Sequence, residues 1–128
     1  MTTRAFPPLL QQYPTIVESR PSKVMVRDHK LYLFGQTSNG IGETLEQQLN
    51  NALSKIDFFL NYHGTCRSYV LHTCIHLHKK NPQNTLMVER IFAEWMDNHV
   101  PLRNLLLKES QLNSEHLVEI EMVVALPE

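Results

Sequence analysis

The residues of this chain best suited to chemistry are an arginine and two glutamates near its C-terminal end. Arg103 stands two positions after Pro101, and Glu119 and Glu121 alternate with apolar residues. A guanidinium can bind a carboxylate through two parallel hydrogen bonds and stays charged at physiological pH. A well-placed carboxylate can orient a water molecule and carry a proton. The pattern indicates a site for a small anion; alternatively, Arg103 only forms a structural ion pair with one of the glutamates.

These residues must be positioned by strands. The period-2 alternation predicts that Glu119 and Glu121 share one face of a strand whose other face is apolar. A capping box of Thr44 and Gln47 precedes an apolar stripe at helical spacing, which ends near Gly64. The predicted elements are, in chain order, strands near 24–26 and 31–34, a helix over 44–64, a strand over 69–77, a helix over 85–98, and strands over 103–107 and 116–125.

This order, β-β-α-β-α-β-β, predicts a single α+β domain. Two helices with one apolar stripe each can cover only one face of a mixed sheet. The other face then needs a protein partner.

The motifs resemble the late signature of the Rid/YjgF family of enamine/imine deaminases, a Pro-x-Arg followed by a strand carrying Glu-Ile-Glu. Residues 31–36 are similar to the family's strand ending in Ser-Gly-Gln, with Phe34 in place of the serine. Residues 46–56 are similar to its first helix. The resemblance covers roughly residues 23–126.

The resemblance implies a chorismate-mutase-like homotrimer with active sites between subunits. It implies hydrolysis of a reactive enamine or imine that carries a carboxylate, giving a keto product and ammonia without a cofactor. Arg103 would bind the substrate carboxylate and Glu119 would position the water. Gly35, Phe34 and Leu105 would line the pocket, Gly35 because a residue without Cβ lets the backbone approach a ligand closely.

Two departures from the family pattern bear on the activity. Phe34 replaces the serine, and Leu105 stands where a cysteine is frequent, so the pocket gains apolar bulk. Two alternatives therefore stay open. One is a non-catalytic trimer that binds a small carboxylate, and the other is a specialised hydrolase acting on a biosynthetic intermediate.

A row of possible metal ligands, His72, Cys74, His76 and His78, alternates along the strand predicted over 69–77 and so shares one face. Thiolate and imidazole suit zinc or copper. Residues two apart on a strand are roughly 6.5 to 7 Å apart, which is awkward for a site built by one strand. Polar filling of an inner surface is the favoured interpretation, and no metal is expected.

Composition sets the remaining bounds. A chain of 128 residues has room for one domain, expected over 23–128, preceded by a proline-rich arm over 1–22. Twelve basic and thirteen acidic residues nearly cancel, which argues against a nucleic-acid or anionic-membrane partner. The expected location is the cytoplasm, since no signal peptide or membrane-length apolar run is found and Cys66 and Cys74 are not placed to form a disulfide.

Overall fold

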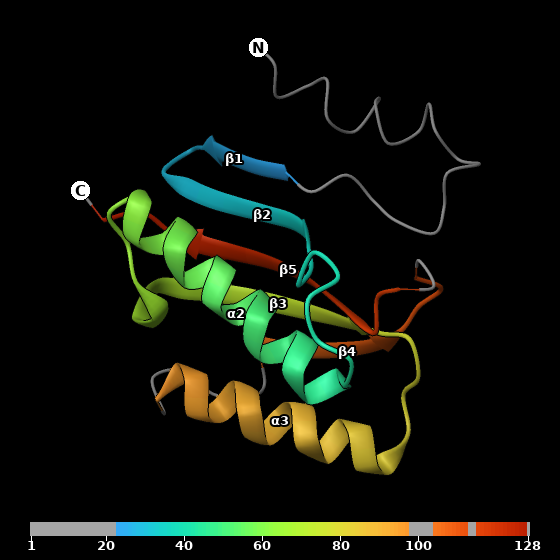
Figure 1. Ribbon diagram of the computed structural model, residues 1–128. Helices are drawn as coiled ribbons and strands as arrows, with labels where there is room; N and C mark the ends of the chain where they lie inside the picture. The colour runs from blue at the N-terminus through green and yellow to red at the C-terminus, as the bar shows by residue number, and fades with distance from the viewer. Residues whose placement is uncertain (1–22, 98–103, 113–114, 128) are drawn as a thin grey trace.

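The computed structural model describes residues 23–97, 104–112 and 115–127. These residues form a five-stranded sheet with two long helices on one side (Figure 1). The elements are β1 (Lys23–Arg27), β2 (Lys30–Gln36), α2 (Leu45–Tyr62), the short 3-10 helix η2 (Arg67–Tyr69), β3 (Val70–Leu77), α3 (Pro82–Met96), β4 (Leu105–Glu109) and β5 (Val118–Ala125). The predicted fold class, a single α+β domain with two helices on a mixed sheet, is confirmed. The proline-rich arm and Arg103 lie outside the described residues.

The sheet places the acidic strand at its centre. The strand order is β1-β2-β5-β3-β4, so β5 has a neighbour on each side. The β3–β4 pair is parallel and the other three pairs are antiparallel. Helix α3 is the crossover that joins the two parallel strands, as such connections require (Figure 1).

The core lies between the helices and one face of the sheet. Each strand contributes alternate residues, and each helix contributes its apolar stripe. Fully burying one large aliphatic or aromatic side chain stabilises the fold by roughly 1.5 to 3 kcal/mol. The core residues that are completely inaccessible include Leu31, Leu33, Leu49, Ile56, Ile75, Leu77, Val88, Met96, Val118, Ile120 and Val124.

Both helices begin at side-chain caps. At α2 the predicted capping box is confirmed: Thr44 Oγ1 accepts a hydrogen bond from the Gln47 backbone N–H at 3.1 Å, and Gln47 Oε1 accepts one from the Thr44 N–H. The predicted start of α3 at residue 85 is wrong by three residues. Asn81 caps the helix through the Asn84 N–H, and Pro82 occupies the first turn, where its missing N–H costs nothing.

The two C-terminal strands begin two residues later than the sequence predicts. Strand β4 starts at Leu105, and β5 starts at Val118. Before β5 the chain is held by the buried side chain of Gln48 in α2. Its amide donates to the Glu115 carbonyl at 3.1 Å and accepts from the Leu117 N–H at 2.8 Å. The Leu117 carbonyl accepts from the His78 N–H at 3.0 Å, so backbone pairing with the segment after β3 begins at this residue.

Candidate functional site

Glu119 lies on the central strand, on the face of the sheet turned away from the helices. Val118 and Ile120 on either side of it are core residues, so the alternation of β5 directs Glu119 to the opposite face. Glu119 is only 2% exposed. His76 of β3, 3% exposed, is its cross-strand partner. The sequence therefore predicted the correct face for Glu119, and the structure adds a buried imidazole as its neighbour.

A β-bulge interrupts β2 beside this face. Leu33 pairs with Met122 and Gln36 with Ile120, so two residues of β2, Phe34 and Gly35, stand across from the single residue Glu121. Gly35 has a φ of 64°, in the left-handed region that L side chains rarely adopt. The glycine thus has a backbone reason for its position in addition to the close approach expected from the resemblance.

Gln36 fixes the bulge to the edge of the sheet. Its buried side-chain amide donates to the carbonyls of Lys23 at 3.1 Å and Phe34 at 2.9 Å. Its Oε1 has no hydrogen-bond partner in the part of the chain that the structure describes. A buried acceptor without a partner costs free energy, and Gln36 is 0% exposed, so this cost falls on the folded protein itself. Sequence reasoning used Gln36 only as part of a motif and missed this group.

The half-buried ring of Phe34 stacks on that of Tyr32, with centroids 6.1 Å apart and planes 8° from parallel. Both belong to the helix-free face, because they alternate with the core residues Leu31 and Leu33. The apolar bulk expected at Phe34 is therefore present beside β5.

Leu105 is not brought together with Glu119. It pairs with Thr73 at the start of β4, two strands away from β5, and it packs against the hydrophobic core on the helix side. Arg103 lies outside the described residues, so its proposed contact with a ligand stays a prediction from sequence. Glu119, Phe34 and Gly35 are predicted site residues on the neighbouring strands β5 and β2, with Phe34 and Gly35 across from Glu121, two residues along β5 from Glu119.

The row of possible metal ligands follows β3 as the alternation predicts. His72, Cys74 and His76 stand across from Val123, Glu121 and Glu119 of β5. Their exposures differ: His72 is exposed, whereas Cys74 and His76 are buried. His78 follows the end of the strand and is exposed. The row therefore divides into a buried pair and two surface histidines.

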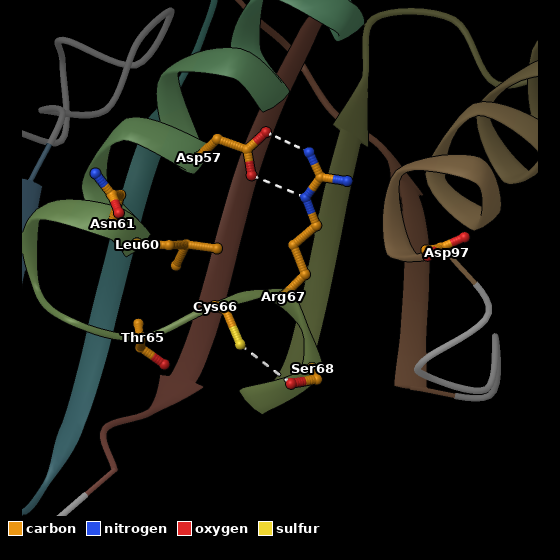
Figure 2. Close-up of a pocket in the computed structure, with 8 residues that line it drawn as sticks. All are labelled: Asp57, Leu60, Asn61, Thr65, Cys66, Arg67, Ser68 and Asp97. Carbon is orange, nitrogen blue, oxygen red and sulfur yellow. Dashed lines mark hydrogen bonds and ion pairs between the residues drawn. The ribbon is translucent and has the colours of Figure 1, made fainter.

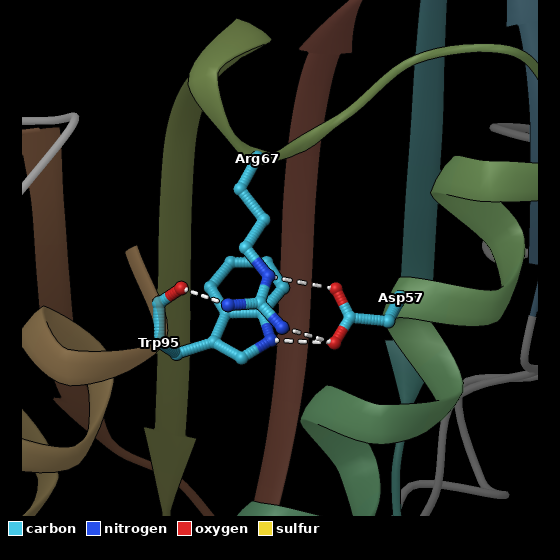
Figure 3. Close-up of polar contacts among 3 residues, drawn as sticks. All are labelled: Asp57, Arg67 and Trp95. Atoms are coloured by element: carbon cyan, nitrogen blue, oxygen red, sulfur yellow. Dashed lines mark hydrogen bonds and ion pairs between the residues drawn. The ribbon is translucent and has the colours of Figure 1, made fainter. Parts of the chain in front are cut away.

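A second polar centre, which the sequence did not reveal, joins α2, η2 and α3 (Figure 3). Arg67 donates to both carboxylate oxygens of Asp57, at 2.9 and 2.6 Å, and its guanidinium lies over the Trp95 ring, 4.7 Å from the centroid. Trp95 Nε1 also donates to Asp57, at 3.1 Å. The hydrogen bond to Asp57 raises the pKa of Arg67. These residues are far apart in the sequence, so no local motif signals their contact.

An open pocket of about 400 Å³ adjoins this centre (Figure 2). Its lining includes Arg67 with the two carboxylates Asp57 and Asp97, and the hydroxyl residues Thr65 and Ser68. The Arg67 guanidinium already bonds Asp57 and the Trp95 carbonyl, so an anion would have to compete with both. The pocket contains none of the predicted site residues. We interpret it as a surface recess beside a structural ion pair.

Comparison with known proteins finds relatives in sequence and in fold. No protein-family model matches the sequence. The chain is 29% identical over 109 residues to RutC family protein YoaB of Escherichia coli, covering 84% of this chain and 92% of that protein. A solved structure of the conserved Rid protein family, YyfA of Yersinia pestis, is 25% identical with a TM-score of 0.71, covering 82% of this chain and 86% of that one.

A YjgF family member from Neisseria meningitidis shares the fold, with a TM-score of 0.70 at 22% identity, over 85% of this chain and 89% of that one. The chain is thus similar in sequence to a RutC family protein and to a Rid family structure, and it shares their fold with the YjgF family member. In the described residues no helix is both long and apolar enough to cross a membrane.

Proposed function

We propose that the protein hydrolyses reactive enamine or imine intermediates that carry a carboxylate, releasing a keto product and ammonia. The observation that carries this proposal is the burial of Glu119 on the helix-free face of the central strand, across from His76. A carboxylate removed from bulk water can hold one water molecule and exchange protons with it. The similarity to the Rid and YjgF proteins supports this chemistry in preference to a purely structural role.

In the proposed reaction an enamine first takes up a proton at carbon and loses one from nitrogen, which gives the imine. Glu119 then accepts a proton from water as the water oxygen bonds to the imine carbon. The same proton passes to nitrogen and gives the carbinolamine. Glu119 then takes the proton of the new hydroxyl group and delivers it to the amino nitrogen, so that the C–N bond breaks and ammonia leaves as the carbonyl forms. Arg103 would hold the substrate carboxylate through its planar fork of donors throughout. No metal or organic cofactor is needed for these steps.

Residues of β2 would shape the pocket. Gly35 in the bulge leaves room for the substrate, and the Phe34 ring forms an apolar wall beside it. Leu105 packs against the core on the helix side, so it is not part of the proposed pocket. Phe34 favours a substrate with an apolar side chain.

We propose a cytoplasmic homotrimer with sites between subunits. The helix-free face carries half-buried Tyr32, Phe34 and Val123, and Leu106 of β4 is 48% exposed on the same face. A second copy of the chain would cover such a face. The same assembly would bring a neighbouring subunit to the edge of the Glu119 site.

A second candidate is a non-catalytic trimer that binds a small carboxylate. The Phe34–Tyr32 stack favours it, because two aromatic rings stand beside the bulge where the family has a small polar residue. In both candidates Arg103 binds the carboxylate of the ligand. They differ in whether Glu119 catalyses hydrolysis of that ligand.

Ammonia release from freshly generated 2-aminoacrylate separates the two. The proposed function predicts that the protein increases the rate of ammonia and pyruvate formation above the spontaneous rate, in proportion to its concentration. The binding candidate predicts that stoichiometric protein protects the enamine or leaves its decay unchanged. A protein that fails on 2-aminoacrylate but accelerates hydrolysis of enamines with larger apolar side chains would still support the deaminase.

A further inference from the structure

Three side chains from two neighbouring strands converge on one point of the helix-free face. They are Cys74 and His76 of β3 and Glu121 of β5, and their sulfur, nitrogen and oxygen atoms all lie within 4.8 Å of one another. We propose that they form a binding site for a zinc-class divalent ion. This site goes beyond the proposed deaminase reaction, which uses no metal.

Two of the three distances between donor atoms fit a tetrahedral centre. Cys74 Sγ lies 3.6 Å from His76 Nε2, and His76 Nε2 lies 3.5 Å from Glu121 Oε1. With zinc bonds of about 2.3 Å to sulfur and 2.0 to 2.1 Å to nitrogen and oxygen, tetrahedral angles separate sulfur from nitrogen by about 3.6 Å and nitrogen from oxygen by about 3.3 Å. These two pairs already stand close to those separations. The sulfur–carboxylate pair is within 4.8 Å and would have to close to about 3.6 Å by rotation of the Glu121 side chain.

Ser110 supports the histidine from behind. Its Oγ lies 2.8 Å from His76 Nδ1, and its backbone N–H donates to the Leu77 carbonyl at 2.9 Å, which fixes it beside β3. When Nδ1 donates its proton to Ser110, the lone pair of Nε2 points to Cys74 and Glu121. Metal-binding histidines commonly have such a partner on the other ring nitrogen, and it sets both the tautomer and the ring orientation.

The donor set selects the kind of ion. A thiolate, a neutral imidazole and a carboxylate carry two negative charges, which a divalent ion neutralises. The sulfur donor favours zinc or a similar transition metal over magnesium or calcium, which prefer oxygen ligands. Three protein ligands leave a fourth position for water or a small ligand, and the side chain of Glu121, 33% exposed, gives the ion access.

Sequence reasoning disfavoured a metal because it considered β3 alone. Residues two apart on one strand have Cα atoms roughly 6.5 to 7 Å apart, but the side chains of Cys74 and His76 bring Sγ and Nε2 to 3.6 Å, so β3 supplies two of the ligands. The antiparallel register supplies the missing ligand by placing Glu121 directly across from Cys74. His72 and His78, which completed the row in the sequence, are exposed and are not members of the cluster.

The test is metal titration of the full-length protein after chelation and thiol reduction. We expect one zinc per chain by calorimetry, and a cobalt complex with a thiolate-to-metal charge-transfer band.

Four variants test the ligands and their support. Cys74→Ser should abolish that band, and Glu121→Gln should raise the zinc Kd by more than about 100-fold. Ser110→Ala should raise it by about 10- to 100-fold, as removal of an outer-shell partner does. Cys66→Ser changes an exposed cysteine outside the cluster and should bind like the parent.

The proposal is overturned if the parent does not bind zinc, if Glu121→Gln binds it like the parent, or if Cys66→Ser loses it. A ratio of one ion per trimer would also overturn it, because the ion would then lie on a shared axis. The Glu121 side chain is partly exposed, so Glu121→Gln should fold. Its zinc affinity therefore tests the proposal even if Cys74→Ser does not fold. Far-ultraviolet circular dichroism of each variant without metal checks folding.

Discussion

His76 of β3 and Glu119 of β5 stand directly across from each other, and both are almost wholly buried. Opposed residues of an antiparallel pair have Cβ atoms about 4.5 to 5.5 Å apart, close enough for their side chains to interact. The proposed catalytic carboxylate therefore has a titratable neighbour that is itself part of the proposed metal site. The two proposals are separable, because Glu121→Gln alters the metal cluster and leaves Glu119 in place.

Replacing Arg103 by lysine tests carboxylate binding. Lysine keeps the charge but loses the planar fork, so bidentate recognition is lost. Disrupting a buried charged hydrogen-bond pair costs about 2 to 5 kcal/mol. We expect kcat/KM to fall roughly 30- to several-thousand-fold. Steady-state ammonia release measures this, with the exposed Arg90→Lys as the matched control. Parent-like kinetics for Arg103→Lys would make Arg103 a structural residue.

Gly35→Ala tests the bulge beside the proposed pocket. Placing an L side chain at a φ of 64° should destabilise the protein by about 1 to 2 kcal/mol. Gly64→Ala is a matched control, since its φ is 73° and the added Cβ meets nothing within 4 Å. Urea unfolding should show a similar loss for both variants, but only Gly35→Ala should raise KM. An equal KM for the two would remove Gly35 from the pocket.

Arg67→Lys tests the centre formed with Asp57 and Trp95. Lysine cannot reproduce the paired bonds to Asp57 together with the bond to the Trp95 carbonyl. Charged hydrogen bonds contribute about 1.5 to 3 kcal/mol each, and partial exposure of this pair reduces that, so we expect a loss of about 1 to 2 kcal/mol. The measurement is the urea midpoint.

Arg90→Lys serves again as the comparison. Arg90 pairs with Glu94 at 3.6 Å on an exposed helix face, where such a pair contributes about 0 to 0.5 kcal/mol. If the two lysine variants unfold at the same urea concentration, the Arg67 centre does not stabilise the contact between α2 and α3.

Measuring the oligomeric state tests whether other copies of the chain cover the helix-free face. Light scattering at micromolar concentration should give a mass about three times that of the 14.9 kDa chain. Leu106→Lys, which adds a charge to the exposed part of this face, should weaken the assembly. A stable monomer in the parent would contradict the trimer and every site placed between subunits.

Much of the fold could be predicted because local patterns determine it. The alternation around Ile120 assigned Glu119 to one face, and the Thr44–Gln47 pair located the start of a helix. The start of the second helix was predicted three residues late, because the apolar stripe alone was used to locate it and the cap formed by Asn81 and Pro82 was not considered.

The less predictable features depend on pairing between strands. The bulge at Phe34 and Gly35 follows from how β2 matches β5, and the position of Glu121 beside Cys74 follows from how β5 matches β3. The spacing of residues within one strand does not determine how that strand pairs with its neighbour. The contact of Asp57 with Arg67 and Trp95 likewise requires the packing of α2 against α3.

The most direct test of the proposed function is kcat for ammonia release by Glu119→Gln. The amide keeps the shape of the side chain but cannot accept a proton, so turnover should fall by about 10²- to 10⁴-fold while ligand binding is largely retained. Glu94→Gln, on an exposed surface of α3, is the control and should match the parent. If Glu119→Gln is folded, assembles like the parent and releases ammonia at the parent rate, Glu119 is not the catalytic carboxylate and the proposed mechanism is wrong.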